Sequence, residues 1–302
     1  MTPVSLPLPP VRLAARVGTV EGAEALRFYL DEGVRLRAVI GDLLPSDWSW
    51  SGKRVLDFGC GSARVLRHFA EEAETGEFSG CDIDAASVDW DRHNLSPPFH
   101  FFRNELAPPL TLSDHGLDLI WAMSVFTHIA DLWSEWLIEM HRLLAPDGIL
   151  IASFLGDGMW EPLVGEPYSE DRVGMTVLRS WDGPEAQVFH SEWWLREHWG
   201  RAFDVLEIVR PPRGSDDTPQ ITHSYIVLRR RDVDVGHEGL EQIDPGERRE
   251  IAALQTSLRL TRKELVAFAA RERDSPVEAL QQGWNSLNRR VRRQWAVRRP
   301  AR

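Results

Sequence analysis

The segment from Val55 to Arg64 constrains the fold more than any other, because an apolar run ends on an acid and then breaks into glycines. This order predicts a buried strand, a tight turn and a helix over residues 62–73. Gly59 and Gly61 let the backbone approach a bound molecule closely, and the N–H groups at the start of the helix can donate hydrogen bonds to it. The segment is therefore typical of a nucleotide-type binding loop.

The acid in this segment indicates which kind of ligand the loop binds. A dinucleotide pyrophosphate carries two negative charges that Asp57 would repel, whereas an ammonium group would be attracted. The dinucleotide pattern G-x-G-x-x-G/A also lacks its third glycine, because Arg64 occupies that position. A zwitterionic ligand is therefore favoured, and a nicotinamide-dependent oxidoreductase is disfavoured.

The stretch from Asp57 to Ser62 resembles the first motif of the class I S-adenosylmethionine-dependent methyltransferases. A second similarity is Gly80–Asp84, and a third is Gly116–Ser124, followed by an amphipathic helix and Leu144–Gly148. In family order, these matches extend roughly from residue 53 to residue 154. Many members have glycine where this chain has Ala63, and we expect alanine to be favourable there because the residue opens a helix.

The resemblance implies S-adenosylmethionine as the cofactor and assigns a partner to each of its groups. Asp57 would favour the ammonium, the N–H groups after Gly59 and Gly61 would meet the carboxylate, and Asp82 would hold the ribose. Ile83 would pack on the adenine ring, and the amide of Asn104 could hydrogen-bond an adenine edge. The full set of cofactor-binding residues implied is Asp57, Gly59, Cys60, Gly61, Asp82, Ile83, Asn104 and Ser124.

Methyl transfer needs a general base only when the acceptor is still protonated. The best candidate is His128, which follows the fourth predicted strand and has an imidazole that titrates near neutral pH. A histidine before a helix is also common as a packing or capping residue. His190, ahead of the predicted helix 191–199, is a weaker second candidate.

Short apolar runs alternate with helical patterns from Lys53 onward, which predicts parallel strands joined by helical crossovers. We expect an α/β fold with a Rossmann-like, doubly wound, seven-stranded sheet whose last strand is antiparallel, and a C-terminal helical appendage. The predicted strands are 54–58, 78–81, 99–103, 117–123, 149–154, 203–209 and 221–228. The predicted helices between them are 62–73, 85–94, 131–144 and 191–199.

Together with the resemblance, these patterns divide the chain into three parts. We expect residues 1–50 to form an N-terminal helical cover segment and residues 51–231 to form the methyltransferase domain. The resemblance implies that residues 156–188 of this domain form a lid over the acceptor. Residues 240–302 form a basic tail with two amphipathic helices, whose apolar residues begin at Ile251 and at Val277. Docking of these helices on the domain and pairing with another chain remain alternatives.

The charge is distributed unevenly along the chain. The formal net charge is −11, yet from Leu240 onward there are fourteen basic and eight acidic residues, so the body is acidic and the tail basic. An acidic body disfavours binding of nucleic acid. We find no membrane span or signal peptide and expect a cytoplasmic protein. Cys60 and Cys81 lack metal-ligand spacing, so we expect neither a disulfide nor a metal site.

The acceptor is less well defined than the cofactor. Nucleic-acid amino-methyltransferases that share the resembled fold usually carry Asn/Asp-Pro-Pro-aromatic after the fourth strand, where this chain has Met123–Phe126. The sequence therefore favours methyl transfer to the oxygen or nitrogen of a small molecule or sugar. The alternative is a non-catalytic module that binds S-adenosylmethionine and recruits a partner through its C-terminal helices.

Overall fold

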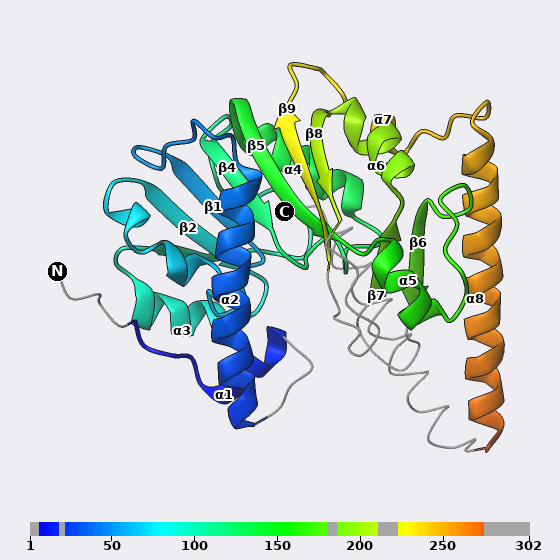
Figure 1. Cartoon of the computed structure of the whole chain (residues 1–302), viewed down its shortest axis with the longest axis horizontal. Helices are drawn as coiled ribbons and strands as arrows, with labels where there is room; N and C mark the ends of the chain where they lie inside the picture. Colours follow the sequence, from blue (N-terminus) through cyan, green and yellow to red (C-terminus); the bar gives the residue numbers. More distant parts are fainter. Residues whose placement is uncertain (1–5, 18–21, 180–185, 211–222, 275–302) are drawn as a thin grey trace, which may run out of the picture.

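The computed structural model describes residues 6–17, 22–179, 186–210 and 223–274. Its centre is a seven-stranded sheet in the order β3-β2-β1-β4-β5-β9-β8 (Figure 1). The first five strands are mutually parallel, and β9 is antiparallel to both β5 and β8. This arrangement confirms the predicted fold. The strands are β1 Arg54–Phe58, β2 Glu77–Asp82, β3 His100–Arg103, β4 Leu117–Ala122, β5 Leu144–Phe154, β8 Phe203–Val209 and β9 Ser224–Arg230.

The two faces of the sheet are covered by different helices (Figure 1). Helix α2, Ala23–Leu43, buries Leu36 and Ile40 against a cluster that includes Trp121 of β4. Helix α4, Trp133–Leu143, packs against the opposite side chains of the same strands. Alternate residues of the strands therefore enter separate cores, as expected for a sheet buried on both faces. Helix α3, Ala85–Leu95, and the short α1, Val11–Ala14, complete the N-terminal half.

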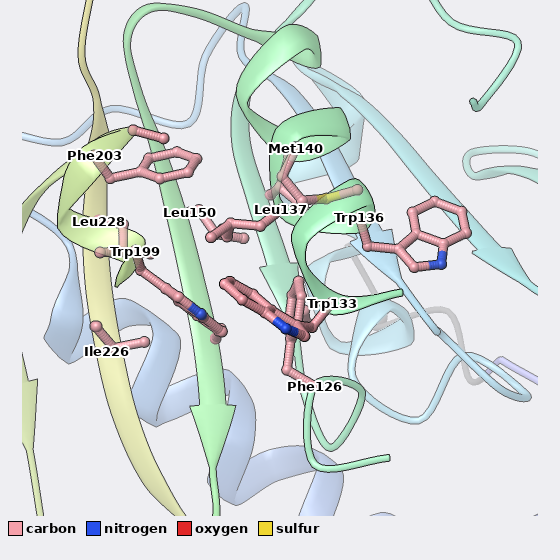
Figure 2. Close-up of a cluster of buried hydrophobic side chains, with 14 of the residues drawn as sticks. Phe126, Trp133, Trp136, Leu137, Met140, Leu150, Trp199, Phe203, Ile226 and Leu228 are labelled. Carbon is pink, nitrogen blue, oxygen red and sulfur yellow. The ribbon is translucent and has the colours of Figure 1, made fainter. Parts of the chain in front are cut away.

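The core under α4 fixes the loop that follows β4. Figure 2 shows Leu137 and Met140 of α4 beside Leu150 of β5, all fully buried. Phe126, from the loop after β4, meets Trp199 with ring centroids 4.9 Å apart. This aromatic contact anchors the loop in the core. Helix α4 begins at Trp133, after the N-cap Leu132, rather than at residue 131 as predicted.

The predicted helix over residues 62–73 is wrong. This region contains turns and two short 3₁₀ segments, Leu66–Phe69 and Glu72–Glu74. Ala63 has φ 56°, a left-handed conformation that a right-handed helix cannot include. Alanine is therefore not favoured here as a helix-opening residue. Helix α2 approaches so closely that a Cβ on Gly33 would lie 2.3 Å from the carbonyl oxygen of Arg64.

The segment predicted as a lid forms a small subdomain beside the sheet (Figure 1). It contains α5, Asp157–Val164, and the antiparallel hairpin of β6, Met175–Arg179, with β7, Ala186–His190. Residues 180–185 of the predicted lid lie outside the described part of the chain. Helix α6, Glu192–His198, follows the hairpin and leads back to the sheet.

The C-terminal helices dock on the body of the protein. Helix α8, Arg248–Asp274, lies along β6, with Ala253 and Leu260 buried (Figure 1). At the start of α8, Glu250 Oε1 lies 2.8 Å from His198 Nε2, while His198 Nδ1 lies 2.6 Å from the carbonyl oxygen of Leu240 at the end of the short helix α7, His237–Glu241. Docking of the first predicted tail helix is thus observed. The second predicted tail helix, near residues 277–291, lies outside the described residues.

The apolar stripe predicted on this helix faces away from the body. Ile251, Leu254, Leu258 and Leu265 are 50–72% exposed, whereas the docked face carries the smaller Ala253 and the single large Leu260. Pairing of this stripe with another chain stays a prediction. None of the helices in the described residues is both long enough and apolar enough to cross a bilayer.

Because α8 docks by one face, replacing two leucines that lie two residues apart should lower the free energy of unfolding by different amounts. Leu260→Ala removes a side chain that is only 3% exposed and should lower the free energy of unfolding by about 2–4 kcal/mol. Leu258→Ala, at a site 72% exposed, should change it by no more than about 0.5 kcal/mol. Urea unfolding of both variants measures the difference, and equal effects would show that α8 does not dock as described.

Candidate functional site

The loop after β1 is bent sharply over the end of β2. The N–H groups of Gly59 and Cys60 both donate to the carbonyl oxygen of Cys81, at 2.8 and 3.0 Å. Gly59 has φ 76° and Gly61 φ 55°, and a Cβ on Gly59 would lie 2.4 Å from Val125 Cγ2. Only glycine fits this close approach between the loops that follow β1 and β4.

Asp82, at the end of β2, holds two loops together. Its Oδ2 accepts a hydrogen bond from the Gly61 N–H at 2.8 Å, and its Oδ1 accepts one from the Asp84 N–H at 2.8 Å. Each carboxylate oxygen keeps a further lone pair for another donor, such as a hydroxyl. Ile83, the next residue, is 47% exposed and offers an apolar surface beside that carboxylate.

Asp57 is buried beneath the loop, with only 2% of its surface exposed. Its Oδ2 has no hydrogen-bond partner among the described residues. Burial raises the pKa of Asp57 to about 7, against the opposing effect of the positive charge of Arg64. A cationic group placed beside this carboxyl would favour its ionised form.

Asp91 is a second buried acid that sequence reasoning missed. It lies on α3, is 0% exposed, and neither carboxyl oxygen has a hydrogen-bond partner among the described residues. Burial, together with the negative charges of Asp57 and Asp82, raises its pKa to about 9. Its helical spacing with the buried Val88 and Leu95 was the available signal, since it places the acid on the inner face of α3.

Asn104 carries an acceptor without a partner near the end of β3. Its backbone N–H donates to the carbonyl oxygen of Asp82 at 3.2 Å, and its Nδ2 donates to that of Glu105 at 2.8 Å. Its Oδ1 is buried and has no partner among the described residues, so it could accept from an amino group. Cys60 is buried, with its Sγ 3.6 Å from the Gly61 carbonyl oxygen.

The loop after β4 brings His128 to the same edge of the sheet. Ser124 has φ 62°, and its N–H donates to Ser153 Oγ at 2.7 Å. His128 Nδ1 lies 3.0 Å from the carbonyl oxygen of Ala186, the first residue of β7. Because a carbonyl oxygen only accepts, Nδ1 carries the proton and Nε2 of the neutral ring keeps a lone pair.

Comparison with known proteins agrees with this geometry. Residues 56–150 match a family described as a methyltransferase domain. A curated relative is phthiotriol/phenolphthiotriol dimycocerosates methyltransferase 1 of Mycobacterium ulcerans (strain Agy99), 30% identical over 139 residues, or 43% of this chain and 50% of that protein. Residues 56–150 are therefore a methyltransferase domain of the class I, S-adenosylmethionine-dependent kind. It spans about half the length of the curated relative that it matches.

Solved structures share the fold of this chain. The PH0226 protein of Pyrococcus horikoshii OT3 aligns with a TM-score of 0.52 at 16% identity, covering 72% of this chain and 98% of its own. A Listeria monocytogenes protein ascribed to the S-adenosylmethionine-dependent methyltransferases aligns with a TM-score of 0.51 at 14% identity, covering 67% of this chain and 99% of its own. At these identities the likeness establishes the fold alone.

The residues at this edge of the sheet fit S-adenosylmethionine, the cofactor of the family. Two buried polar atoms that have no partner in the described part of the chain, Asp57 Oδ2 and Asn104 Oδ1, are available to a ligand that brings donors. The backbone at Gly59 and Gly61 provides the close approach that such a ligand requires. The structure therefore brings all eight of the predicted cofactor-binding residues to the carboxyl ends of β1 to β4.

The two predicted catalytic histidines have different surroundings. His190 is 1% exposed and packs against Trp194 and Trp199, with ring centroids 5.3 and 5.7 Å away. Burial lowers its pKa to about 3, so it is neutral near pH 7, and its contacts favour a packing role. His128 is exposed beside the hairpin.

Sequence reasoning missed His223, which directly precedes β9. Its Nδ1 lies 3.5 Å from Ser153 Oγ. Its place depends on the pairing of Ser224 with Phe154, so it could be found only by assuming the antiparallel register of β9 against β5. Away from this edge, the described residues include one group of potential metal ligands, Glu135, His237 and Glu241.

Asp91 predicts a pH-dependent effect on stability. Its pKa of about 9 in the folded protein exceeds the value of about 3.9 in an unfolded chain, so its ionisation destabilises the fold progressively as the pH rises from about 4 to about 9. Asp91→Asn should therefore raise the free energy of unfolding by at least about 2 kcal/mol at pH 9 and by little at pH 4. Urea unfolding across this range measures the effect. The exposed Asp89→Asn is the control, and a gain that does not depend on pH would contradict the assignment.

Proposed function

We propose that this chain transfers a methyl group from S-adenosylmethionine to an oxygen or nitrogen atom of a small molecule or sugar. The observation that carries the proposal is the His128 imidazole, whose Nδ1 is engaged by the carbonyl oxygen of Ala186 and whose Nε2 is left as a base. This ring follows β4 closely, at the edge of the sheet where the cofactor residues gather.

The cofactor would be held by the residues that the resemblance implied. Asp57 would favour the ammonium, and Asp82 would accept from the ribose hydroxyls. The backbone of Gly59, Cys60 and Gly61 would line the cofactor closely, with its own N–H groups already donating to Cys81 and Asp82. The remaining contacts would come from Ile83 on the adenine ring, Asn104 Oδ1 on its amino group, and Ser124 near the reacting methyl group. These roles are supported by the partnerless Oδ atoms of Asp57 and Asn104.

The bound cofactor supplies an activated methyl group, so the chain needs to provide little covalent chemistry. Its residues would exclude water and place the acceptor in line, which can contribute about 7–11 kcal/mol for ideal positioning. His128 Nε2 would take the acceptor proton where the acceptor carries one.

The lid over residues 156–188 is connected to this base through its hairpin. The Val188 N–H donates to the carbonyl oxygen of Thr127 at 2.8 Å, one residue before His128. We infer that the hairpin covers the acceptor and sets the orientation of the imidazole. The curated relative is named for dimycocerosates rather than for a nucleic acid, which supports a non-polymeric acceptor.

The exposed apolar stripe of α8 favours a second candidate, a cofactor-binding module that recruits a partner through this helix. Tight cofactor binding without methyl transfer to any compound would support the module. The expected cytoplasmic location stays a prediction in either case.

Cofactor binding should release protons near neutral pH. With a pKa of about 7, Asp57 is about half protonated at pH 7 in the free protein, and a nearby ammonium would favour its carboxylate. Calorimetric titration with S-adenosylmethionine at pH 7 should therefore release about half a proton, seen as a heat that depends on the ionisation enthalpy of the buffer. Asp57→Asn should remove this release and weaken binding by about tenfold or more.

The matched control for this titration is Asp89→Asn, which should keep both the affinity and the proton release. At pH 9 the release attributable to Asp57 should vanish, because the carboxyl is already ionised there. Equal heats in all buffers at pH 7 would contradict contact between Asp57 and the ammonium.

His128→Asn should lower turnover by about 100-fold while leaving the affinity for S-adenosylmethionine unchanged, because the base is lost and the cofactor contacts remain. Transfer of a tritiated methyl group to compounds of a small-molecule extract measures the rate. His93→Asn, at an exposed position of α3, is the control and should keep full activity. Turnover of His128→Asn within a few-fold of the parent would remove His128 as the base.

A further inference from the structure

A second imidazole stands at the same edge of the sheet as His128. His223 directly precedes β9, and three strands converge beside it: Ser124 follows β4, Ser153 lies in β5, and Ser224 opens β9. Ser153 Oγ accepts from the Ser124 N–H at 2.7 Å and lies 3.5 Å from His223 Nδ1. The described residues therefore connect the loop of His128 to His223 through one serine hydroxyl.

These contacts favour opposite tautomers for the two rings. Because Ser153 Oγ already accepts from the Ser124 N–H, its own hydrogen is available to His223 Nδ1. The neutral His223 ring then carries its proton on Nε2 and offers a donor. His128 carries its proton on Nδ1, toward the Ala186 carbonyl oxygen, and offers an acceptor at Nε2.

The surroundings of His223 keep its ring neutral. Burial lowers its pKa to about 4, and the neighbouring Arg64 and Arg35 act in the same direction. Glu32 opposes them, but both of its carboxyl oxygens accept hydrogen bonds from Arg35, at 2.6 and 2.7 Å. A cationic acceptor would thus be repelled here, whereas an oxygen that develops negative charge would be stabilised.

We propose that His223 is a second residue of the acceptor site and that, with His128, it selects a hydroxyl group as the methyl acceptor. This proposal rests on the proposed methyl transfer. A hydroxyl can donate to His128 Nε2 and accept from the His223 Nε2–H at the same time, whereas an alkylammonium can only donate. The acceptor oxygen bonds to the methyl carbon, the methyl–sulfur bond breaks with its electron pair remaining on sulfur, and the hydroxyl proton goes to His128 Nε2.

The tautomers can be measured in the protein without any ligand. Nitrogen-15 NMR of histidine-labelled protein at pH 7, assigned with His128→Asn and His223→Asn, should show His223 protonated at Nε2 and His128 protonated at Nδ1. Ser153→Ala should shift His223 toward a mixture of tautomers. A His223 ring protonated at Nδ1, or charged at pH 7, overturns the proposal.

Selectivity is tested with tritiated S-adenosylmethionine and three probe acceptors: catechol, methyl α-glucopyranoside and benzylamine. Label should enter a hydroxyl compound and not benzylamine. His223→Leu should lower that rate by about tenfold, and His223→Asn, which keeps an N–H donor, by less. The two variants should have the same cofactor affinity as the parent, which separates this role from a general loss of folding.

Label in benzylamine alone, or in none of the three while the cofactor binds, overturns hydroxyl selection. Failure to bind S-adenosylmethionine would instead remove the proposed function. The NMR pattern distinguishes the two failures, because it depends only on Ser153, Ala186 and the two rings.

Discussion

The Asp82 carboxylate makes the contacts on which the rest of the site depends. By accepting from the Gly61 N–H and from the Asp84 N–H, it fixes the loop after β1 against the start of α3. Asp84 in turn caps α3 by accepting from the Ser87 N–H at 3.0 Å. The Asp82 side chain therefore fixes both the backbone of the glycine loop and the position of the helix that carries Asp91.

The second half of the site depends on a different chain of contacts. From α8, the docked Leu260 packs with Trp160 and Phe189 of the lid subdomain, in which β6 pairs with β7, while the Glu250–His198 contact holds α8 against α6. From β7, Val188 and Ala186 contact Thr127 and His128. The position of the proposed base is thus linked to the C-terminal helix by backbone pairing and side-chain packing, with no direct contact between them needed.

Local signals in the sequence were sufficient for the strands and for the glycine loop. The acid and the glycines from Asp57 to Gly61 mark the end of β1 because each has a conformational or electrostatic reason to be there. The helix over 62–73 could not be excluded in the same way. The left-handed Ala63 and the close approach of Gly33 to the backbone of Arg64 are tertiary constraints, and they override a favourable helical pattern.

Two other features also depend on tertiary contacts that the sequence pattern does not reveal. The heptad-like stripe of α8 predicted a helix correctly, but the pattern does not tell which face meets the body, and the smaller side chains dock. His223 required the register of β9 against β5, which sequence periodicity does not fix. The meeting of residues at the ends of parallel strands could be expected from the sequence, whereas the place of His223, which depends on an antiparallel register, could not.

The acidic and the basic side chains of the site lie at different parts of the sheet. Asp57, Asp82 and Asp91 gather on the side of β1, β2 and α3, where their mutual repulsion is part of what raises the pKa values of Asp57 and Asp91. His128, His223 and Arg35 gather on the side of β4, β9 and α2. In the proposed reaction, a cofactor with a cationic ammonium would relieve the repulsion on the first side, and an acceptor that becomes an oxyanion would be stabilised on the second. The cofactor and the methyl acceptor would therefore each be favoured on a different side of the site by its charge, and the two would meet at the end of β4.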